Sequence, residues 1–165
     1  VEAAMTGHLV LSTLHTNDAP STIGRLIDLE VEPYLIASTL SVAVAQRLVR
    51  RICPRCVQPH APAESEVEDL QMDKLNVPAG LAFFKGKGCN NCKTSGYKGR
   101  TAVHEMMTLS DPIRRLIVNK ASASEIRRAA IDGGMVPLRK CAILKASKGV
   151  TTIEEILRVT KNEEI

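Results

Sequence analysis

Aromatic residues are scarce in this sequence: its 165 residues include two Tyr, two Phe and no Trp. The hydrophobic 44% is therefore mostly aliphatic, which favours helix packing and argues against an aromatic-walled ligand cavity. The 22 basic and 18 acidic residues leave a net charge of only +4. Because nucleic acids are bound by strongly basic surfaces, often with stacking aromatics, we expect no nucleic-acid partner.

The sequence also lacks a long apolar run and a secretion signal. Its longest nearly apolar stretch, residues 35–45, is about half of the ~20 residues that a membrane-spanning helix needs. Residues 1–4 carry no positive charge ahead of an apolar region, as a signal peptide would. We therefore expect a cytoplasmic protein of ordinary domain size with reduced thiols.

Hydrophobic spacing and capping residues predict a mixed α/β chain. The apolar residues 8–15 predict a buried strand, and residues 100–107 predict a second one. The predicted helices begin after Asp18, at Tyr34 (through Arg51), at Glu64 (through Leu75), after Ser110, after Ser122, at Val136 (through Lys148) and after Thr152. Composition divides the chain into residues 1–52, a Cys-rich insertion over 53–99, and a return strand with a helical tail over 100–165.

Four of the five cysteines form two C-x-x-C pairs, Cys53 with Cys56 and Cys89 with Cys92, separated by 32 residues. Two such pairs can surround one metal with four thiolates, which selects Zn²⁺ or less often iron. Disulfides and thioredoxin-like redox chemistry are disfavoured, because there is no secretion signal and no βαβ context. The spacing predicts a structural zinc site without an open coordination position, and Cys141 is expected in a helix core.

Two histidines lie at the opposite ends of the first predicted strand. His8 and His15 are seven residues apart, and this odd spacing puts their side chains on opposite faces of a strand, so we do not expect them to share a metal. His15 precedes the polar residues 16–18 at the carboxyl end of the strand, where α/β sheets place ligand-binding groups. A functional and a structural role for His15 both stay open at this point, whereas His60 and His104 have no such context.

Residues 3–19, AAMTGHLVLSTLHTNDA, closely resemble the His box of secretion ATPases, the hexameric motors of type II secretion and type IV pilus assembly. The resemblance continues through residues 45–53 (AQRLVRRIC) and the second Cys pair. It resumes in residues 96–105 (GYKGRTAVHE) and 151–160 (TTIEEILRVT). It therefore extends over essentially the whole chain.

This resemblance implies the C-terminal part of a RecA-like P-loop ATPase, with an inserted tetracysteine zinc subdomain and a helical C-terminal tail. In such a motor His15, and with it His8, would act as catalytic residues near the γ-phosphate. Arg47 and Arg50 match a basic segment beside the nucleotide, where nucleotide contact, subunit contact and packing all stay open. The implied cofactors are structural Zn²⁺, ATP and Mg²⁺. The implied partners are further copies in a hexamer and platform proteins, at the cytoplasmic face of the inner membrane.

The sequence lacks a motif that the resemblance leads us to expect. The phosphate-binding loop G-x-x-x-x-G-K-[ST] occurs nowhere in it, and P-loop ATPases rely on this loop for positioning and charge neutralisation during phosphoryl transfer. We therefore expect a C-terminal fragment that does not hydrolyse ATP alone. A strand over residues 8–15 would then lack the neighbouring strands that pair with it. Three alternatives follow: the fragment dimerises, a helix covers the edge of the strand, or this segment is poorly ordered.

Other functions stay open beside the motor. The Cys-rich insertion could dock a membrane platform protein without catalysis, or its basic residues could bind nucleic acid, against which the scarcity of aromatics counts. Type II secretion and type IV pilus motors are not separated by any local motif. The insertion favours an extension motor over a retraction motor.

Overall fold

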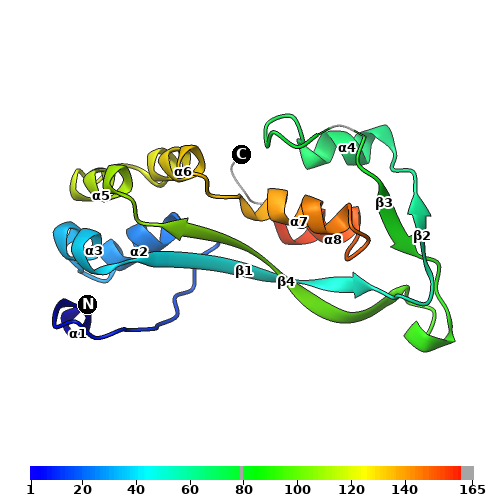
Figure 1. Ribbon diagram of the computed structural model, residues 1–165, viewed down its shortest axis with the longest axis horizontal. Coiled ribbons are helices and arrows are strands. Elements are labelled where there is room, and N and C mark those ends of the chain that lie inside the picture. The colour runs from blue at the N-terminus through cyan, green and yellow to red at the C-terminus, as the bar shows by residue number, and fades with distance from the viewer. Residues whose placement is uncertain (79, 161–165) are drawn as a thin grey trace. The chain divides into compact units, whose positions relative to one another are not determined.

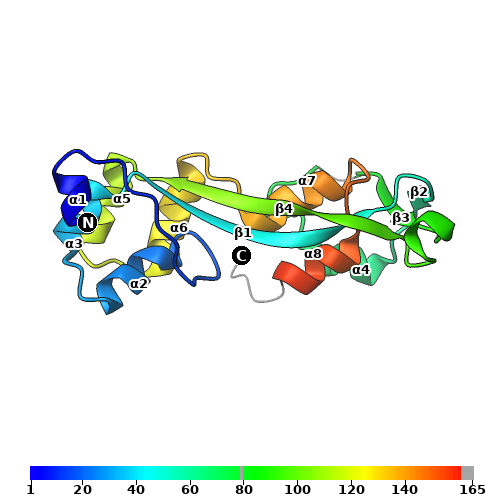
Figure 2. The same cartoon turned by 90° about the horizontal axis from the view of Figure 1, so that it is seen from below.

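The computed structural model describes residues 1–78 and 80–160 and divides into two compact units (Figure 1, Figure 2). The first unit consists of Val1–Ala45 and Glu105–Val136. The second consists of Gln46–His104 and the described residues from Pro137 onward. Each unit is therefore built from two stretches of chain, while the three-segment division expected from composition stays a prediction.

Helices are the main regular elements of the first unit. They are α1 (Glu2–Met5), α2 (Ser21–Asp28), α3 (Pro33–Thr39), α5 (Asp111–Val118) and α6 (Ala123–Asp132). Both α3 and α6 pack against α2 and α5. Apolar residues at helical spacing form the buried core between these helices, chiefly Ile23, Ile36, Ile113, Ile117 and Ile126.

Capping groups in the sequence fix where these helices begin. Ser122 and Glu125 form the predicted capping box of α6: the Glu125 N–H donates to Ser122 Oγ at 3.3 Å, and the Ser122 N–H donates to Glu125 Oε2 at 2.8 Å. Pro112 lies in the first turn of α5, where a backbone N–H would have no acceptor within the helix, so the missing N–H of proline costs no hydrogen bond. The helix starts predicted after Ser110 and Ser122 are confirmed.

Two pairs of strands contribute to the second unit. β1 (Val42–Ile52) and β4 (Tyr97–Thr108) pair with each other and have residues in both units. β2 (Val57–His60) and β3 (Phe83–Gly86) form an antiparallel pair with Val57 opposite Gly86. The β2–β3 pair lies within the segment of chain between the two C-x-x-C sequences.

The helices of the second unit are α4 (Glu64–Leu70), α7 (Leu138–Ala146), α8 (Ile153–Thr160) and the 3₁₀ turn η1 (Asn90–Cys92). α8 packs against both α7 and α4. The buried Arg139 of α7 donates to the Thr160 carbonyl at 2.5 Å, to Thr160 Oγ1 at 3.0 Å and to the Asp69 carbonyl at 3.3 Å. This guanidinium therefore satisfies carbonyls at the C-terminal ends of α8 and α4.

The predicted helix over residues 34–51 is wrong beyond its first turns. α3 ends at Thr39, and the following residues form β1, in which exposed Val44 and Leu48 alternate with buried Ala45 and Val49. Ala, Leu and Arg are good helix formers, so local propensity favoured a helix. Pairing with β4, far along the chain, overrides that propensity.

The predicted buried strand over residues 8–15 is not formed either. Residues 8–16 belong to no helix or strand, and Leu9 and Leu11 are 89% and 88% exposed. A strand needs a neighbour to satisfy its backbone, and neither described sheet includes this segment. The mixed α/β character of the chain is confirmed, while the RecA-like P-loop fold stays a prediction.

The remaining elements agree with the sequence more closely. The strand expected over residues 100–107 lies within β4, and the helices expected at Glu64 and Val136 are the shorter α4 and α7. The helix starts expected after Asp18 and Thr152 are those of α2 and α8. Within the described residues, no helix combines the length and the apolar character that crossing a membrane requires.

Candidate metal centre and the histidine segment

The four paired cysteines lie where two strands end. Cys53 follows the last residue of β1, and its N–H donates to the Gly96 carbonyl at 2.9 Å, just before β4 begins. Cys89 directly precedes the η1 turn and Cys92 is its last residue; Lys93, in the left-handed region (φ 51°), follows it. The pairing of β1 with β4 therefore brings the two C-x-x-C sequences together.

Glycines allow the backbones around the cysteines to approach closely. A Cβ on Gly86 would lie 2.1 Å from the Gly96 carbonyl oxygen, a distance that no side chain tolerates. A Cβ on Gly88, at φ +94°, would lie 2.6 Å from the Thr94 carbonyl oxygen. The glycines near the second Cys pair are therefore required by the packing of one loop on another.

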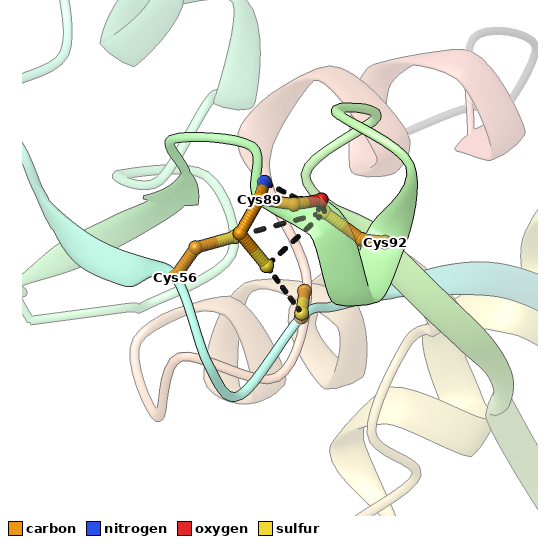
Figure 3. Close-up of side chains that lie close together, drawn as sticks. Cys56, Cys89 and Cys92 are labelled. Atoms are coloured by element: carbon orange, nitrogen blue, oxygen red, sulfur yellow. Dashed lines mark hydrogen bonds between the residues drawn. The ribbon is translucent and has the colours of Figure 1, made fainter.

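The four sulfurs form one compact cluster. Sγ atoms are 3.9 Å apart between Cys53 and Cys89, 3.9 Å between Cys56 and Cys92, and 3.7 Å between Cys89 and Cys92. Figure 3 shows the side chains of Cys56, Cys89 and Cys92 converging, and all four Sγ atoms lie within 4.8 Å of one another. Tetrahedral zinc with Zn–S bonds of ~2.3 Å needs sulfurs about 3.8 Å apart, so the spacing fits one ion.

Hydrogen bonds to the sulfurs of Cys53 and Cys92 favour the thiolate forms that a metal requires. The N–H groups of Cys89 and Gly96 donate to Cys92 Sγ at 3.2 and 3.3 Å. Burial raises the pKa of Cys92, but these N–H groups and the neighbouring thiols together lower it to about 6. The side-chain amide of Asn91 lowers the pKa of Cys53, whereas burial and the adjacent sulfurs raise that of Cys56 to about 12.

This donor set can hold a metal ion, and the predicted cluster is confirmed among the described residues. Four sulfur ligands complete a tetrahedral shell, so no position is left for water or substrate. A metal here would stabilise the fold rather than catalyse a reaction. Cys141 lies on α7 and is not part of the cluster, as expected, but it is half-buried and not in the core as predicted.

The predicted catalytic histidines lie in the exposed segment that precedes α2. His8 is exposed, with its Nδ1 atom 2.9 Å from Thr6 Oγ1. His15 is exposed as well, and because this segment is not a strand, the two rings are not placed on opposite faces of a strand as predicted. Catalytic roles for both residues stay predictions.

The turn that follows His15 is held by two acidic side chains, the buried Glu105 and the half-buried Asp18, whose contacts with distant residues were not predicted from the sequence. The Ala19 N–H donates to the buried Glu105 carboxylate of β4 at 2.7 Å. Asp18 Oδ1 accepts from the Ser21 N–H at 2.8 Å, at the start of α2, while Asp18 Oδ2 pairs with Arg127 of α6 at 3.0 Å. The capping role of Asp18 was readable from the sequence, but its pairing with Arg127 was not, since the two residues are far apart in the chain.

The two predicted cofactor-binding arginines lie on β1. Arg47 is half-buried. The Arg50 guanidinium is 4.0 Å from the centre of the Tyr97 ring, and its Nε donates to Glu155 Oε1 at 2.9 Å. This arrangement gives Arg50 a structural role, while nucleotide contact by Arg47 or Arg50 stays a prediction.

Comparison with known proteins agrees with the motifs. The model of a family described as type II/IV secretion system protein matches residues 1–158. The chain belongs to this family. It is 44% identical over 160 residues to the type IV pilus assembly ATPase PilB of Myxococcus xanthus, covering 95% of this chain and 28% of that protein. It is 43% identical over 163 residues to the type II secretion system protein E of Pseudomonas aeruginosa, covering 99% of this chain and 32% of that protein.

The chain spans about a third or less of the curated relatives that it matches. A further relative, the type IV pilus assembly ATPase PilB of Thermus thermophilus, is 44% identical over 159 residues, which make up 96% of this chain and 18% of that protein. The family resemblance inferred from the motifs is therefore confirmed. Relatives named for pilus assembly and for type II secretion are about equally similar, so identity does not separate the two systems.

Proposed function

We propose that this chain is the C-terminal part of a motor ATPase that powers the assembly of a type IV pilus or of a type II secretion pseudopilus. The observation that carries the proposal is the family match over residues 1–158, supported by relatives at 40–44% identity named for these systems. The motor is a hexamer at the cytoplasmic face of the inner membrane. ATP and Mg²⁺ are its cofactors.

Within that motor the chain supplies two functional parts. Zn²⁺ bound by Cys53, Cys56, Cys89 and Cys92 holds the two strand ends together as a structural site. His15, assisted by His8, approaches the γ-phosphate when the segment over residues 8–16 gains its strand neighbours. Because the sequence has no phosphate-binding loop, hydrolysis depends on residues outside this sequence.

The experiment grafts this chain onto the Pseudomonas relative in place of its corresponding C-terminal segment. The graft is expected to hydrolyse ATP with a requirement for Mg²⁺, whereas the 165-residue chain alone shows no turnover. His15→Ala should lower kcat of the graft by about 100-fold, because a group that stabilises phosphate charge is lost.

His104→Ala is the matched control, since His104 is an exposed histidine of β4 outside the His-containing segment. The control is expected to keep the activity of the parent graft. Mg²⁺-dependent turnover by the isolated chain would contradict the proposed dependence on other residues. A folded, zinc-loaded graft without activity would contradict the motor assignment.

A second candidate function, docking of a membrane platform protein, is favoured by the charge around the cysteines. Residues 51–58 and 84–100 contain seven basic side chains, all exposed, and no acidic one, leaving 15 basic and 18 acidic residues in the rest of the sequence. They are Arg51, Arg55, Lys85, Lys87, Lys93, Lys98 and Arg100. The chemistry of this surface suits an acidic segment of a platform protein.

Charge reversal tests the docking function. Lys85→Glu with Lys87→Glu should weaken binding to an acidic platform segment by about tenfold at low salt, because two attractive charges become repulsive. Lys74→Glu with Lys148→Glu changes the net charge equally with exposed residues outside this surface. Equal loss in both pairs would contradict a localised surface, and salt-dependent binding of generic DNA instead would favour a nucleic-acid partner.

A further inference from the structure

A chain of two hydrogen bonds links Lys98 to one sulfur of the metal cluster. Lys98 Nζ donates to Asn91 Oδ1 at 2.6 Å, and Asn91 Nδ2 donates to Cys53 Sγ at 3.4 Å. Asn91 belongs to the second C-x-x-C sequence, yet its side chain reaches the sulfur of the first. The side chain therefore joins the two halves of the cluster without occupying a ligand position.

Lys98 determines which end of the Asn91 amide faces sulfur. An ammonium group has three donors and no acceptor, so it can bond only to the oxygen of the amide. With that oxygen directed at Lys98, the NH₂ group is directed at Cys53. The reversed amide would place its NH₂ group against the ammonium and its oxygen against the thiolate, two unfavourable contacts at once.

Cys53 accepts a hydrogen bond from a side chain in addition to one from the backbone of Arg55, whereas Cys92 accepts from two backbone N–H groups. Cys92 Sγ accepts from the N–H groups of Cys89 and Gly96, which no substitution at another side chain removes directly. Cys53 is fully buried, and the amide of Asn91 donates to its sulfur. Loss of this amide would leave the buried sulfur without that donor.

Asn91 and Lys98 would also offset the negative charge of the cluster when zinc is bound. Four thiolates around Zn²⁺ carry a net charge of −2, which is unfavourable in a partly buried position. The Lys98 ammonium and the polarised amide between it and Cys53 offset part of that charge. Lys98 is exposed, so its positive charge reaches the cluster mainly through the amide to which it is bonded.

Resting on the proposed metal site, we propose that Asn91 and Lys98 are positioning residues for the metal. Asn91 holds the Cys53 sulfur in its ligating position, and Lys98 holds Asn91 in the orientation that permits this. The proposal gives Lys98, in the family motif over residues 96–105, a role that the proposed motor function does not supply.

The test measures zinc affinity of the 165-residue chain by competition with a chromophoric chelator. Asn91→Ala is expected to weaken zinc binding by about 10-fold to 100-fold, the usual effect of removing a group that orients a ligand. Lys98→Met should weaken it less, by about threefold to tenfold, since the amide remains but is no longer held. Lys98→Arg keeps a donor and should stay close to the parent chain.

Asn90→Ala and Lys87→Met are the matched controls, because both change exposed side chains of the same kind beside the cluster. The double variant Asn91→Ala/Lys98→Met should bind zinc no more weakly than Asn91→Ala, because Lys98 acts through Asn91. In the Co²⁺-loaded chain, Asn91→Ala should shift the sulfur-to-metal charge-transfer band, and Asn90→Ala should not.

Affinities within twofold of the parent for both Asn91→Ala and Lys98→Met, with unchanged Co²⁺ spectra, would overturn the inference while the zinc site stands. A parent chain that binds neither zinc nor cobalt would overturn the metal site and this inference with it. If Asn91→Ala does not fold, Lys98→Met decides, because it alters only an exposed side chain.

Discussion

The carboxylate of Glu155 accepts two hydrogen bonds from Arg50: from its backbone N–H at 2.7 Å and from its Nε at 2.9 Å. Glu155 is fully buried on α8, and Arg158 donates to it as well, at 2.8 and 2.9 Å. Arg50 is three residues before Cys53 and lies over the ring of Tyr97, which opens β4. One buried carboxylate thus holds the strand that leads into the metal cluster.

Removing this carboxylate should destabilise the second unit. Glu155→Ala is expected to lower the free energy of unfolding by about 3 kcal/mol, because Arg50 and Arg158 lose a buried partner. Urea unfolding followed by circular dichroism measures the change. The matched control is Glu154→Ala, whose carboxylate is 71% exposed and 3.5 Å from Arg50, and which should cost less than about 1 kcal/mol. Equal effects of the two variants would contradict the role of Glu155.

The same carboxylate should make stability depend on acid pH. Burial alone raises the pKa of Glu155, but hydrogen bonds from Arg158 and Arg50 together lower it to about 2, against an ordinary 4.5. A lowered carboxyl pKa stabilises the fold above pH 4.5, and that contribution is lost as the pH falls from 4.5 towards 2. The loss should be about 3 kcal/mol. Glu155→Gln should flatten the stability profile in this range, and an unchanged profile would refute the assignment.

Metal removal should affect the chain as strongly as loss of a ligand. The purified chain is expected to contain about one zinc, and chelation or Cys89→Ser should lower the unfolding temperature by about 10 °C or more. Cys141→Ser is the control, since that thiol lies on α7 outside the cluster. Elemental analysis and calorimetry make the two measurements. Less than half an equivalent of metal in fully reduced chain would contradict the zinc site.

Glu105 should control the order of the turn after His15. Glu105→Ala removes the buried acceptor of the Ala19 N–H and is expected to speed hydrogen exchange at that amide by about tenfold or more. Met106→Ala changes the exposed neighbour on the same strand and should leave the exchange unchanged. Amide exchange read by NMR separates the two. Retained protection in Glu105→Ala would mean that other contacts of the turn suffice.

Local patterns in the sequence determined the starts of the helices and the composition of the metal cluster. A capping box such as Ser122 with Glu125 works within one turn of helix, and a C-x-x-C pair aims two sulfurs at one centre, so both are readable from neighbouring residues. The motifs that indicate the family are continuous runs of residues, so they too can be read from neighbouring residues. These features need no information about distant parts of the chain.

The tertiary structure decided what depends on distant contacts. β1 is a strand, although its residues favour a helix, because β4 pairs with it; residues 8–16 stay outside both sheets because no described segment pairs with them. The Arg50–Glu155 pair, the Ala19–Glu105 bond and the reach of Asn91 to Cys53 each join residues far apart in the sequence. Strand pairing and buried ion pairs gain their free energy from such neighbours, so no local pattern specifies them.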